Sequence, residues 1–348
     1  VHCPLQRYSM LVARLHLTTQ PSPPSARPRM STARKILLGA LIAAVLAVFG
    51  AVGFIYFIDS KIDKIPDEEL PSLVSELEDN GVRNILIVGS DSREGLDDLD
   101  DFGSFGGSRT DVIMVAHIVP GEGAQLLSLP RDLTREIPGH DTNRINAAFV
   151  FGGPDLLVQT IQNNLDIPIH HYVEIDFVGF ANVVDSLGGI TKTFDNPARD
   201  SKSGLDVEAG TMVMDGMTAL QYARSRNYQE LVDGSWKTVD GSDIGRTHRQ
   251  QEVLLLMFDK ATSKSGAFNL PSFASTFAEQ IRADAGFSVN VMVELGRAAL
   301  SLSSSEIQTV TLPVQNHTED GRAYVIPIDP DAASIIAAFI AGDAFPEG

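Results

Sequence analysis

The sequence predicts a three-layer α/β/α domain around a central mixed sheet, preceded by a single N-terminal transmembrane helix. Apolar or alternating runs typical of strands recur at 84–89, 111–119, 124–129, 170–177 and 190–194. Segments with helix-starting residues lie between and after these runs, and such alternation is typical of an α/β fold. A continuous uncharged run near the N-terminus predicts the membrane helix.

The uncharged run covers residues 36–58, which is 23 positions. That length crosses a hydrocarbon core of about 30 Å. Basic residues precede the run and acidic ones follow it, so the positive-inside rule puts residues 1–35 in the cytoplasm. We therefore expect a single-pass cell-membrane protein with a basic cytoplasmic tail (1–35), a transmembrane helix (36–58), an extracytoplasmic linker (59–80) and one folded domain (81–348).

Residues 1–29 are rich in proline, serine and arginine, which is typical of a disordered tail. Met30 is also an ordinary start just before a membrane anchor, so these residues are either a tail or lie upstream of the native start. The only cysteine is Cys3. The exported part therefore has no disulfide, and a hydrophobic core must stabilise it.

Charge narrows the class of ligand. The chain has a formal net charge of −18, of which residues 1–35 contribute +6 and the remainder therefore −24. Such an acidic body excludes nucleic acid as the partner, because phosphate neutralisation needs a basic face. An anionic ligand would have to bind at a local cluster of arginines.

Helices are expected where capping residues meet apolar periodicity. One is predicted over 154–165 with Pro154 in its first turn, and one over 177–187 with Asp176 as N-cap and Gly188 as its stop. Further helices are expected to start near Asp215, Asp243 and Ser288, and a last one after Asp329-Pro330.

Arginine and aspartate pairs mark the ends of three predicted strands. The first strand runs into Gly89-Ser90-Asp91-Ser92-Arg93, the second opens at Arg109-Thr110-Asp111, and the third closes at Leu129-Pro130-Arg131-Asp132. Strand ends of an α/β sheet meet at a shared rim where ligands bind. The acidic, glycine-rich residues 97–107 are expected to form a surface loop over this rim. The pattern predicts an anion-plus-metal site.

A second set of charges falls on predicted helices. Arg224-Ser225-Arg226 ends the helix that starts at Asp215. On the following helix, Arg246, Arg249 and Gln250 share one 120° arc with Asp243, on the side that continues into apolar residues. Arginines on a burying face need an anionic partner. A phosphate would supply one.

Seven of the 14 arginines after the apolar run fall in these five motifs: Arg93, Arg109, Arg131, Arg224, Arg226, Arg246 and Arg249. Each alone has an ordinary explanation as a solvated helix end or a surface ion pair. Together they predict a polyanion pocket, since the arginine fork binds phosphate oxygens bidentately. Carboxylates beside a phosphorylated substrate favour Mg²⁺ or Mn²⁺ over zinc. No Gly-x-x-x-x-Gly-Lys-Ser/Thr loop occurs.

The order of these motifs resembles the LytR-CpsA-Psr family of bacterial cell-envelope phosphotransferases. The resemblance covers residues 82–262 closely. It rests on the three strand-end motifs, on Arg144-Ile145-Asn146-Ala147-Ala148-Phe149, on Asp215 through Arg226, and on Asp243 through Gln250.

The resemblance implies transfer of a glycopolymer from a polyprenyl-pyrophosphate carrier to a peptidoglycan hydroxyl during cell wall assembly. The polymer could be a teichoic acid, a capsule or an arabinogalactan-type chain. By position, Asp91 and Asp111 would hold the metal, and Asp91 is also the candidate base. The residues expected to bind pyrophosphate are Arg93, Arg109, Arg131, Arg224, Arg226, Arg246, Arg249 and Gln250, and those expected to act in catalysis are Asp91, Arg109, Arg131, Arg224 and Arg226.

Two other functions remain compatible with the residues. The same metal and arginines would serve a polyprenyl-pyrophosphate phosphohydrolase with water as acceptor. A non-catalytic envelope regulator would only bind the lipid-linked polymer. The family also binds the lipid tail in an apolar tunnel, for which Leu157, Ile161 and Val184 are suitable in type, although ordinary core explains them equally well.

Overall fold

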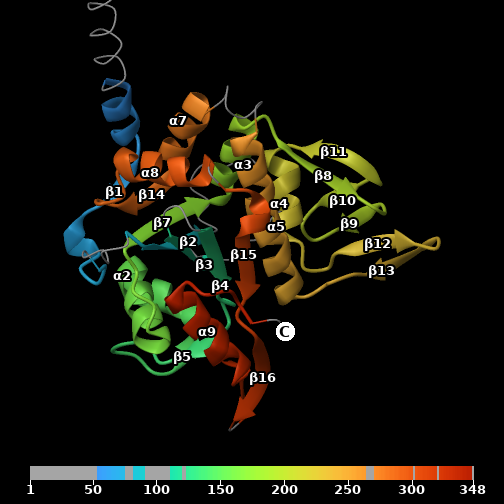
Figure 1. The fold of residues 1–348 in the computed structure, drawn as a ribbon. Helices are drawn as coiled ribbons and strands as arrows, with labels where there is room; N and C mark the ends of the chain where they lie inside the picture. The colour runs from blue at the N-terminus through green and yellow to red at the C-terminus, as the bar shows by residue number, and fades with distance from the viewer. Residues whose placement is uncertain are drawn as a thin grey trace, which may run out of the picture. The chain divides into compact units, whose positions relative to one another are not determined.

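The computed structural model describes residues 53–74, 81–90, 110–119, 123–263, 270–300, 302–319 and 321–346 (Figure 1). The chain divides into two units, 1–51 and 52–348, and all described residues belong to the second. Within that part, no helix combines the length and apolar character that a bilayer crossing requires. Most of the run 36–58 lies outside the described residues, so the membrane helix stays a prediction.

The centre of the described unit is a seven-stranded mixed sheet in the order β1-β14-β7-β2-β3-β4-β15. β2 runs parallel to β7 and antiparallel to β3, and β4 runs antiparallel to β3 and parallel to β15. The four sheet strands predicted here from residues 84 to 177 are confirmed, with ends shifted by one residue. The bounds are β1 (Asp63–Ile65), β2 (Arg83–Ser90), β3 (Thr110–Val119), β4 (Gly123–Ser128), β7 (His171–Asp176), β14 (Ile281–Asp284) and β15 (Ile307–Thr311).

The register brings three strand ends to one edge. Ser90, the last residue of β2, pairs with Thr110, the first of β3. Ser128, the last of β4, pairs with Met114 of β3. Because β2 and β4 both run antiparallel to β3, their carboxyl ends lie beside its amino end. We call this edge of the sheet the rim. The expected meeting of the three strand ends is therefore confirmed.

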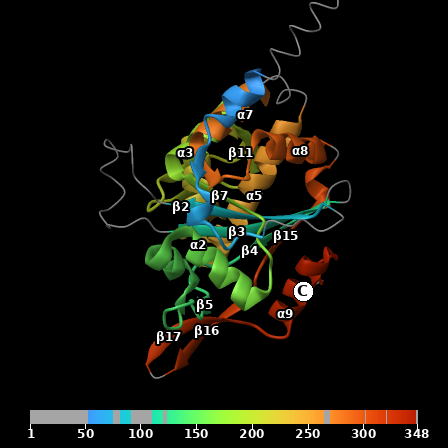
Figure 2. The same cartoon turned by 90° about the vertical axis from the view of Figure 1, so that its left-hand side faces the viewer.

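One face of the sheet is covered by α2 (Ile145–Leu165) and α9 (Asp331–Ala341). Figure 2 shows α2 on one side of β2, β3 and β4, and α3 (Phe177–Ser186) and α7 (Leu270–Gln280) on the other. Leu157 and Ile161 of α2 are fully buried with sheet residues in one hydrophobic cluster. These two side chains, which were also suitable in type for a lipid tunnel, therefore pack in the hydrophobic core.

α2 differs from the predicted helix over 154–165. It begins at Ile145 and is interrupted at Gly152 and Gly153, where Gly153 has a φ of 68°. Only glycine adopts this left-handed conformation readily. The predicted helix corresponds to the second half of α2. Pro154 lies in the first turn of this half, a position in which proline is tolerated.

The opposite face carries α5 (Asp243–Thr262), α7 and α8 (Val289–Leu300). Ile85 and Val173 of the sheet pack there with Ala278 and Val289 from α7 and α8. Helices therefore cover both faces of a mixed sheet, as the sequence predicts for an α/β fold. The predicted helix starts near Asp215, Asp243 and Ser288 are confirmed, although the N-cap of α5 is Ser242, which accepts a 3.0 Å hydrogen bond from Gly245 N.

A smaller part of the described unit packs against α5 on the side of Val253. It contains α3, α4 (Gly216–Arg224), a two-stranded sheet and a four-stranded sheet in the order β10-β9-β12-β13. Met214, Tyr222 and Val253 belong to its shared hydrophobic cluster. Its strands are β8 (Ile190–Phe194), β11 (Gly210–Met214), β9 (Ala198–Asp200), β10 (Leu205–Val207), β12 (Gln229–Val232) and β13 (Ser235–Thr238); of these, only β8 was predicted.

Two hairpins complete the described unit. They are formed by β5 (Thr134–Arg135) with β6 (Asn143–Arg144) and by β16 (Val314–Glu319) with β17 (Arg322–Pro327). Short 3₁₀ turns cover Asp67–Glu69 and Ser304–Glu306.

Part of the expected linker 59–80 belongs to the folded unit. Residues 63–65 form β1, which pairs in parallel with β14 at the edge of the central sheet. Ile62 and Ile65 are buried, and Asp59 Oδ1 accepts a 3.0 Å hydrogen bond from Val289 N. The apolar side chains in this first part of the expected linker therefore contribute to the core of the folded unit.

Candidate functional site

Charged side chains from distant parts of the chain meet at the rim. Asp111, at the start of β3, accepts a hydrogen bond through Oδ1 from Arg131, which follows β4. Arg226, just past the end of α4, has Nη2 3.9 Å from the same oxygen. The sheet register and the end of α4 therefore place two guanidinium groups on one carboxylate.

The first turn of α5 adds a second carboxylate and a third guanidinium. Asp243 Oδ1 lies 3.3 Å from Arg226 Nε and 3.1 Å from Arg246 Nη2. Arg246 Nη2 also donates a 3.3 Å hydrogen bond to the backbone oxygen of Asp111. Arg246 is only 3% exposed. Asp243 thus joins α4 and α5, and Arg246 joins α5 to the start of β3.

Asp132 completes the group. Its Oδ2 lies 3.8 Å from Arg131 Nε, and its Oδ1 lies 3.4 Å from Nη1 of the exposed Arg144. Asp132 therefore lies between two arginines and pairs with both. We call the following six residues the rim cluster: Asp111, Arg131, Asp132, Arg226, Asp243 and Arg246.

Electrostatics within the rim cluster follow from burial and opposed charges. Burial alone would lower the pKa of Arg131, but Asp111, Asp132 and Asp243 outweigh it and raise that pKa. Burial raises the pKa of Asp243, and Asp132 and Asp111 add to this, while Arg226 and Arg131 oppose it. The Nε atoms of Arg131 and Arg246 are buried and find no hydrogen-bond acceptor among the described residues. An oxyanion is the kind of ligand that satisfies such donors.

The Arg224-Ser225-Arg226 segment is held from behind by Asp200, the last residue of β9. Asp200 Oδ2 accepts hydrogen bonds from Ser225 Oγ at 2.7 Å, Arg226 N at 3.0 Å and Asn227 N at 2.8 Å. Its Oδ1 accepts one from Lys202 N at 2.9 Å. Burial alone would raise the pKa of Asp200, but these four bonds together hold it below its ordinary value. Asp200 therefore positions the segment that presents Arg226.

Arg249 supports the same segment from the other side. It is 4% exposed, and its Nη2 donates to the backbone oxygens of Ser225 at 2.7 Å and Asp240 at 3.2 Å. Its guanidinium also lies over the ring of Tyr228, 4.9 Å from the centroid. These contacts position the segment that presents Arg226, while the buried Nε of Arg249 finds no hydrogen-bond acceptor among the described residues.

The remaining predicted site residues are not among the six residues of the rim cluster. The Arg224 guanidinium lies over the ring of Phe177, 4.5 Å from its centroid. Gln250 is partly buried and hydrogen-bonds through its side chain to none of the described residues. The buried neighbour Gln251 instead donates to Ser128 Oγ at 2.8 Å and to the Val310 backbone oxygen at 3.0 Å. Asp91, Arg93 and Arg109, the other predicted site residues, lie outside the described residues.

Sequence reasoning missed Asp200 as a functional residue. It lies 25 positions before Ser225 on a short strand, without a motif that would mark it. Asp243 and Asp132 were visible as parts of motifs, but their role in pairing particular arginines depends on how β4, α4 and α5 meet.

Hard-cation binding needs several carboxylate oxygens facing one point. In the part of the chain that the structure describes, no group of three or more histidine, cysteine, aspartate or glutamate residues could hold a metal ion. Asp111 uses Oδ1 for Arg131, and its Oδ2 accepts no hydrogen bond from a described residue. That oxygen fits one ligand position for Mg²⁺, and Asp91, the second predicted ligand, lies outside the described residues.

The fold and the rim cluster together define a class: an α/β protein with an arginine-rich rim suited to a phosphorylated polyanion. The particular family follows from comparison. The chain matches the model of the LytR_cpsA_psr family over residues 56–339, and it belongs to that family. The resemblance drawn from the motifs is thereby confirmed.

Individual proteins of related name are also similar to this chain. The chain is 37% identical over 235 residues to a probable cell wall biosynthesis protein, LcpB, of Corynebacterium glutamicum, covering 66% of this chain and 53% of that protein, so the match spans about half of the relative. It is 26% identical over 311 residues to the polyisoprenyl-teichoic acid–peptidoglycan teichoic acid transferase TagU of Oceanobacillus iheyensis, covering 84% and 89%. A solved LytR-Csp2A-Psr enzyme from Actinomyces oris superposes with a TM-score of 0.64 at 28% identity, covering 80% and 96%.

Proposed function

We propose that this chain is a phosphotransferase that moves a glycopolymer from a polyprenyl-pyrophosphate carrier to a peptidoglycan hydroxyl. The observation that carries the proposal is the convergence of Arg131, Arg226 and Arg246 on Asp111 and Asp243 in an otherwise acidic chain. The transferase name of the relative TagU supports it, because that match covers most of both chains.

The chemistry asks mainly for positioning and charge stabilisation. The acceptor oxygen forms a bond to the phosphorus that carries the glycopolymer, the bridging P–O bond breaks, and polyprenyl phosphate leaves with the electron pair. Arg131, Arg226 and Arg246 bind the phosphate oxygens and stabilise the charge that develops on them. The acceptor's proton must pass to a base.

Asp91 and Asp111 are the residues proposed to hold Mg²⁺ or Mn²⁺, which when bound would neutralise pyrophosphate charge. Asp91 is also the proposed base for the acceptor proton. One carboxylate cannot fill both roles at once, so a proton-accepting Asp91 would leave Asp111 as the protein's ligand.

We also propose that the described unit lies outside the cell membrane, anchored by residues 36–58. Phe54, Tyr56 and Phe57, at the end of this run, are exposed on helical residues 53–59. Aromatic side chains gather at membrane interfaces, which supports this placement. In cells, a protease added from outside should cleave the unit only after the wall is opened; protection in such cells would contradict the proposal.

The first test uses the full chain in detergent with a short prenyl pyrophosphate, with and without Mg²⁺. We expect phosphate release that needs the metal and falls at least about 100-fold in Arg131→Ala, since a phosphate-binding arginine contributes several kcal/mol to the transition state. Arg199→Ala is the matched control, because Arg199 is an exposed arginine lying over Trp236 on the small sheet.

Adding peptidoglycan fragments separates transfer from hydrolysis. A ligase should join the glycopolymer to the fragments and release less free product to water. Release to water that fragments leave unchanged would favour a phosphohydrolase. Saturable binding that Arg131→Ala abolishes, without cleavage under either condition, would favour a binding-only regulator.

A further inference from the structure

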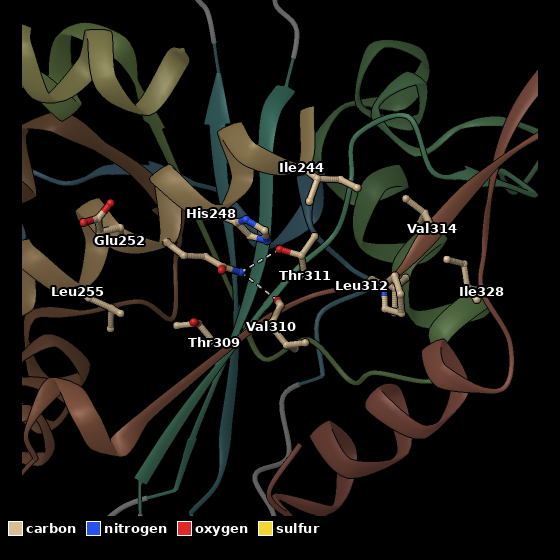
Figure 3. A pocket seen from close by; sticks show the side chains of 12 residues that line it. Ile244, His248, Glu252, Leu255, Thr309, Val310, Thr311, Leu312, Val314 and Ile328 are labelled. Atoms are coloured by element: carbon tan, nitrogen blue, oxygen red, sulfur yellow. Dashed lines mark hydrogen bonds between the residues drawn. The ribbon is translucent and has the colours of Figure 1, made fainter. Parts of the chain in front are cut away.

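A groove with a volume of about 660 Å³ lies between the outward side of α5 and strand β15 (Figure 3). One wall consists of Ile244, His248, Glu252 and Leu255 of α5, and the other of residues 309–314 with Ile328. Its volume is in the range of pockets that bind small organic ligands. None of the predicted phosphate-binding residues lines it.

Both walls begin at the rim. Ile244 directly follows Asp243 of the rim cluster. On the other wall, Leu312 N donates a 3.0 Å hydrogen bond to Ser128 O at the end of β4, three residues before Arg131. From Ile244 to Leu255 the helix rises about 16 Å. A ligand extended along the groove would therefore have one end at the rim.

Gln251 fixes the two walls to each other. Its Nε2 donates to Val310 O at 3.0 Å and Ser128 Oγ at 2.8 Å, and so bridges α5 to β15 and β4. Buried amide bonds of this kind define a single spacing between helix and strand. The groove is thus a formed feature of the fold.

The lining does not suit a phosphate, because it contains no lysine or arginine. Its one carboxylate, Glu252, already accepts hydrogen bonds from Tyr222 Oη at 2.5 Å and from Lys192. His248 Nδ1 lies 3.1 Å from Asp240 Oδ2. Apolar side chains such as Leu255 alternate with the hydroxyls of Thr309 and Thr311. This mixture suits a neutral ligand with apolar faces and hydroxyl or amide groups.

We propose that the groove binds the acceptor, a neutral N-acetylated oligosaccharide, and directs its hydroxyl to the rim cluster. The inference rests on the proposed function. A prenyl tail fits less well, because it would desolvate His248 and Glu252 without replacing their bonds to water. A peptide pairing with β15, the last strand of the sheet, is the other alternative.

The test is methyl NMR of the full chain in detergent, titrated with chitotetraose. We expect shifts at the methyl groups of groove residues that are not fully buried, on Ile244, Leu255, Val310, Val314 and Ile328. Thr309→Arg should weaken binding by at least about tenfold by filling the groove. Thr211→Arg, at an exposed threonine of β11, should leave it unchanged. Should Thr309→Arg fail to fold, the methyl shifts of the unmodified chain alone decide.

Absence of shifts at these methyl groups, or shifts only elsewhere, would overturn the proposal. So would a response of the same methyl groups to farnesyl phosphate or a wall stem peptide but not to chitotetraose. Prenyl-pyrophosphate cleavage without glycan binding would remove this inference and leave the proposed function. Glycan binding here in a chain that neither binds nor cleaves prenyl pyrophosphate would remove the proposed function and leave a glycan site.

Discussion

Replacing Asp200 by alanine should misplace the Arg224-Ser225-Arg226 segment. The change removes all four hydrogen bonds that Asp200 accepts. Lys202 and Asn227 are exposed, so water can reach their N–H groups. Ser225 is fully buried and Arg226 partly so, and at about 1–3 kcal/mol per stranded donor the fold should lose about 2–5 kcal/mol.

The loss of pyrophosphate affinity should exceed the loss caused by an equally destabilising change elsewhere in the chain. Arg226 bridges Asp111 and Asp243, so a displaced segment should weaken pyrophosphate binding about 10- to 100-fold. Isothermal titration of the full chain with inorganic pyrophosphate measures this, and urea unfolding measures stability. Asp200→Asn keeps one carbonyl oxygen in place and should restore most of the affinity.

Asp215→Ala is the matched control. Asp215 caps the start of α4, the helix that ends at Arg224, and accepts a 2.8 Å hydrogen bond from Thr218 N. Its replacement should lower the free energy of unfolding by about 1 kcal/mol and leave pyrophosphate affinity unchanged. If Asp200→Ala loses stability but binds pyrophosphate normally, Asp200 does not position Arg226.

Acid supplies an independent check on Asp200. Because its pKa is lowered in the folded protein, the ionised carboxylate stabilises the fold above the ordinary carboxyl pKa. That contribution disappears as the pH falls through the lowered value. The stability difference between the unmodified chain and Asp200→Ala should therefore shrink in acid, and a constant difference would contradict the assignment.

Three further predictions concern the rim cluster. Arg226→Lys should weaken sulfate binding about tenfold, because an ammonium group cannot bridge two carboxylates as a planar fork does; unchanged affinity in calorimetry would refute this. Sulfate affinity should rise as the pH falls from about 7 to about 4, because protonation of Asp243, whose pKa is raised, removes a negative charge; Asp243→Asn should flatten this profile, and identical profiles would contradict it. A chelator should abolish prenyl-pyrophosphate cleavage and Asp111→Asn should raise the Mg²⁺ concentration needed, whereas equal rates with and without chelator would exclude the metal role.

The central sheet could be predicted because its strands are apolar and bounded by charged motifs. The meeting of Asp111 with Arg131 followed from the general position of strand ends. Local signals also located the helix starts at Asp176 and Asp215, whose side chains accept the expected hydrogen bonds. In each case, the residues that support the prediction form a short motif, a few positions long.

The features that were not predicted depend on distant contacts. Gly152 and Gly153 are typical of a helix end, and only packing of Ile145 and Ala148 into the core explains why the chain is helical before them. The arc shared by Arg246 and Arg249 correctly indicated burial. It could not show that Arg249 would find its partners in the backbone of Ser225 and Asp240.

The pairing of Arg131 with Asp111 has a thermodynamic consequence. A cation bound at the free Oδ2 of Asp111 would draw charge away from Oδ1 and weaken the ion pair with Arg131, and that guanidinium would then bind an arriving anion more readily. Linkage then requires reciprocity: whatever factor the cation adds to anion affinity, the anion adds to cation affinity. With the cation or the anion alone, the carboxylates and guanidinium groups of the rim cluster would remain paired with one another. Only the two ligands together would open these ion pairs fully.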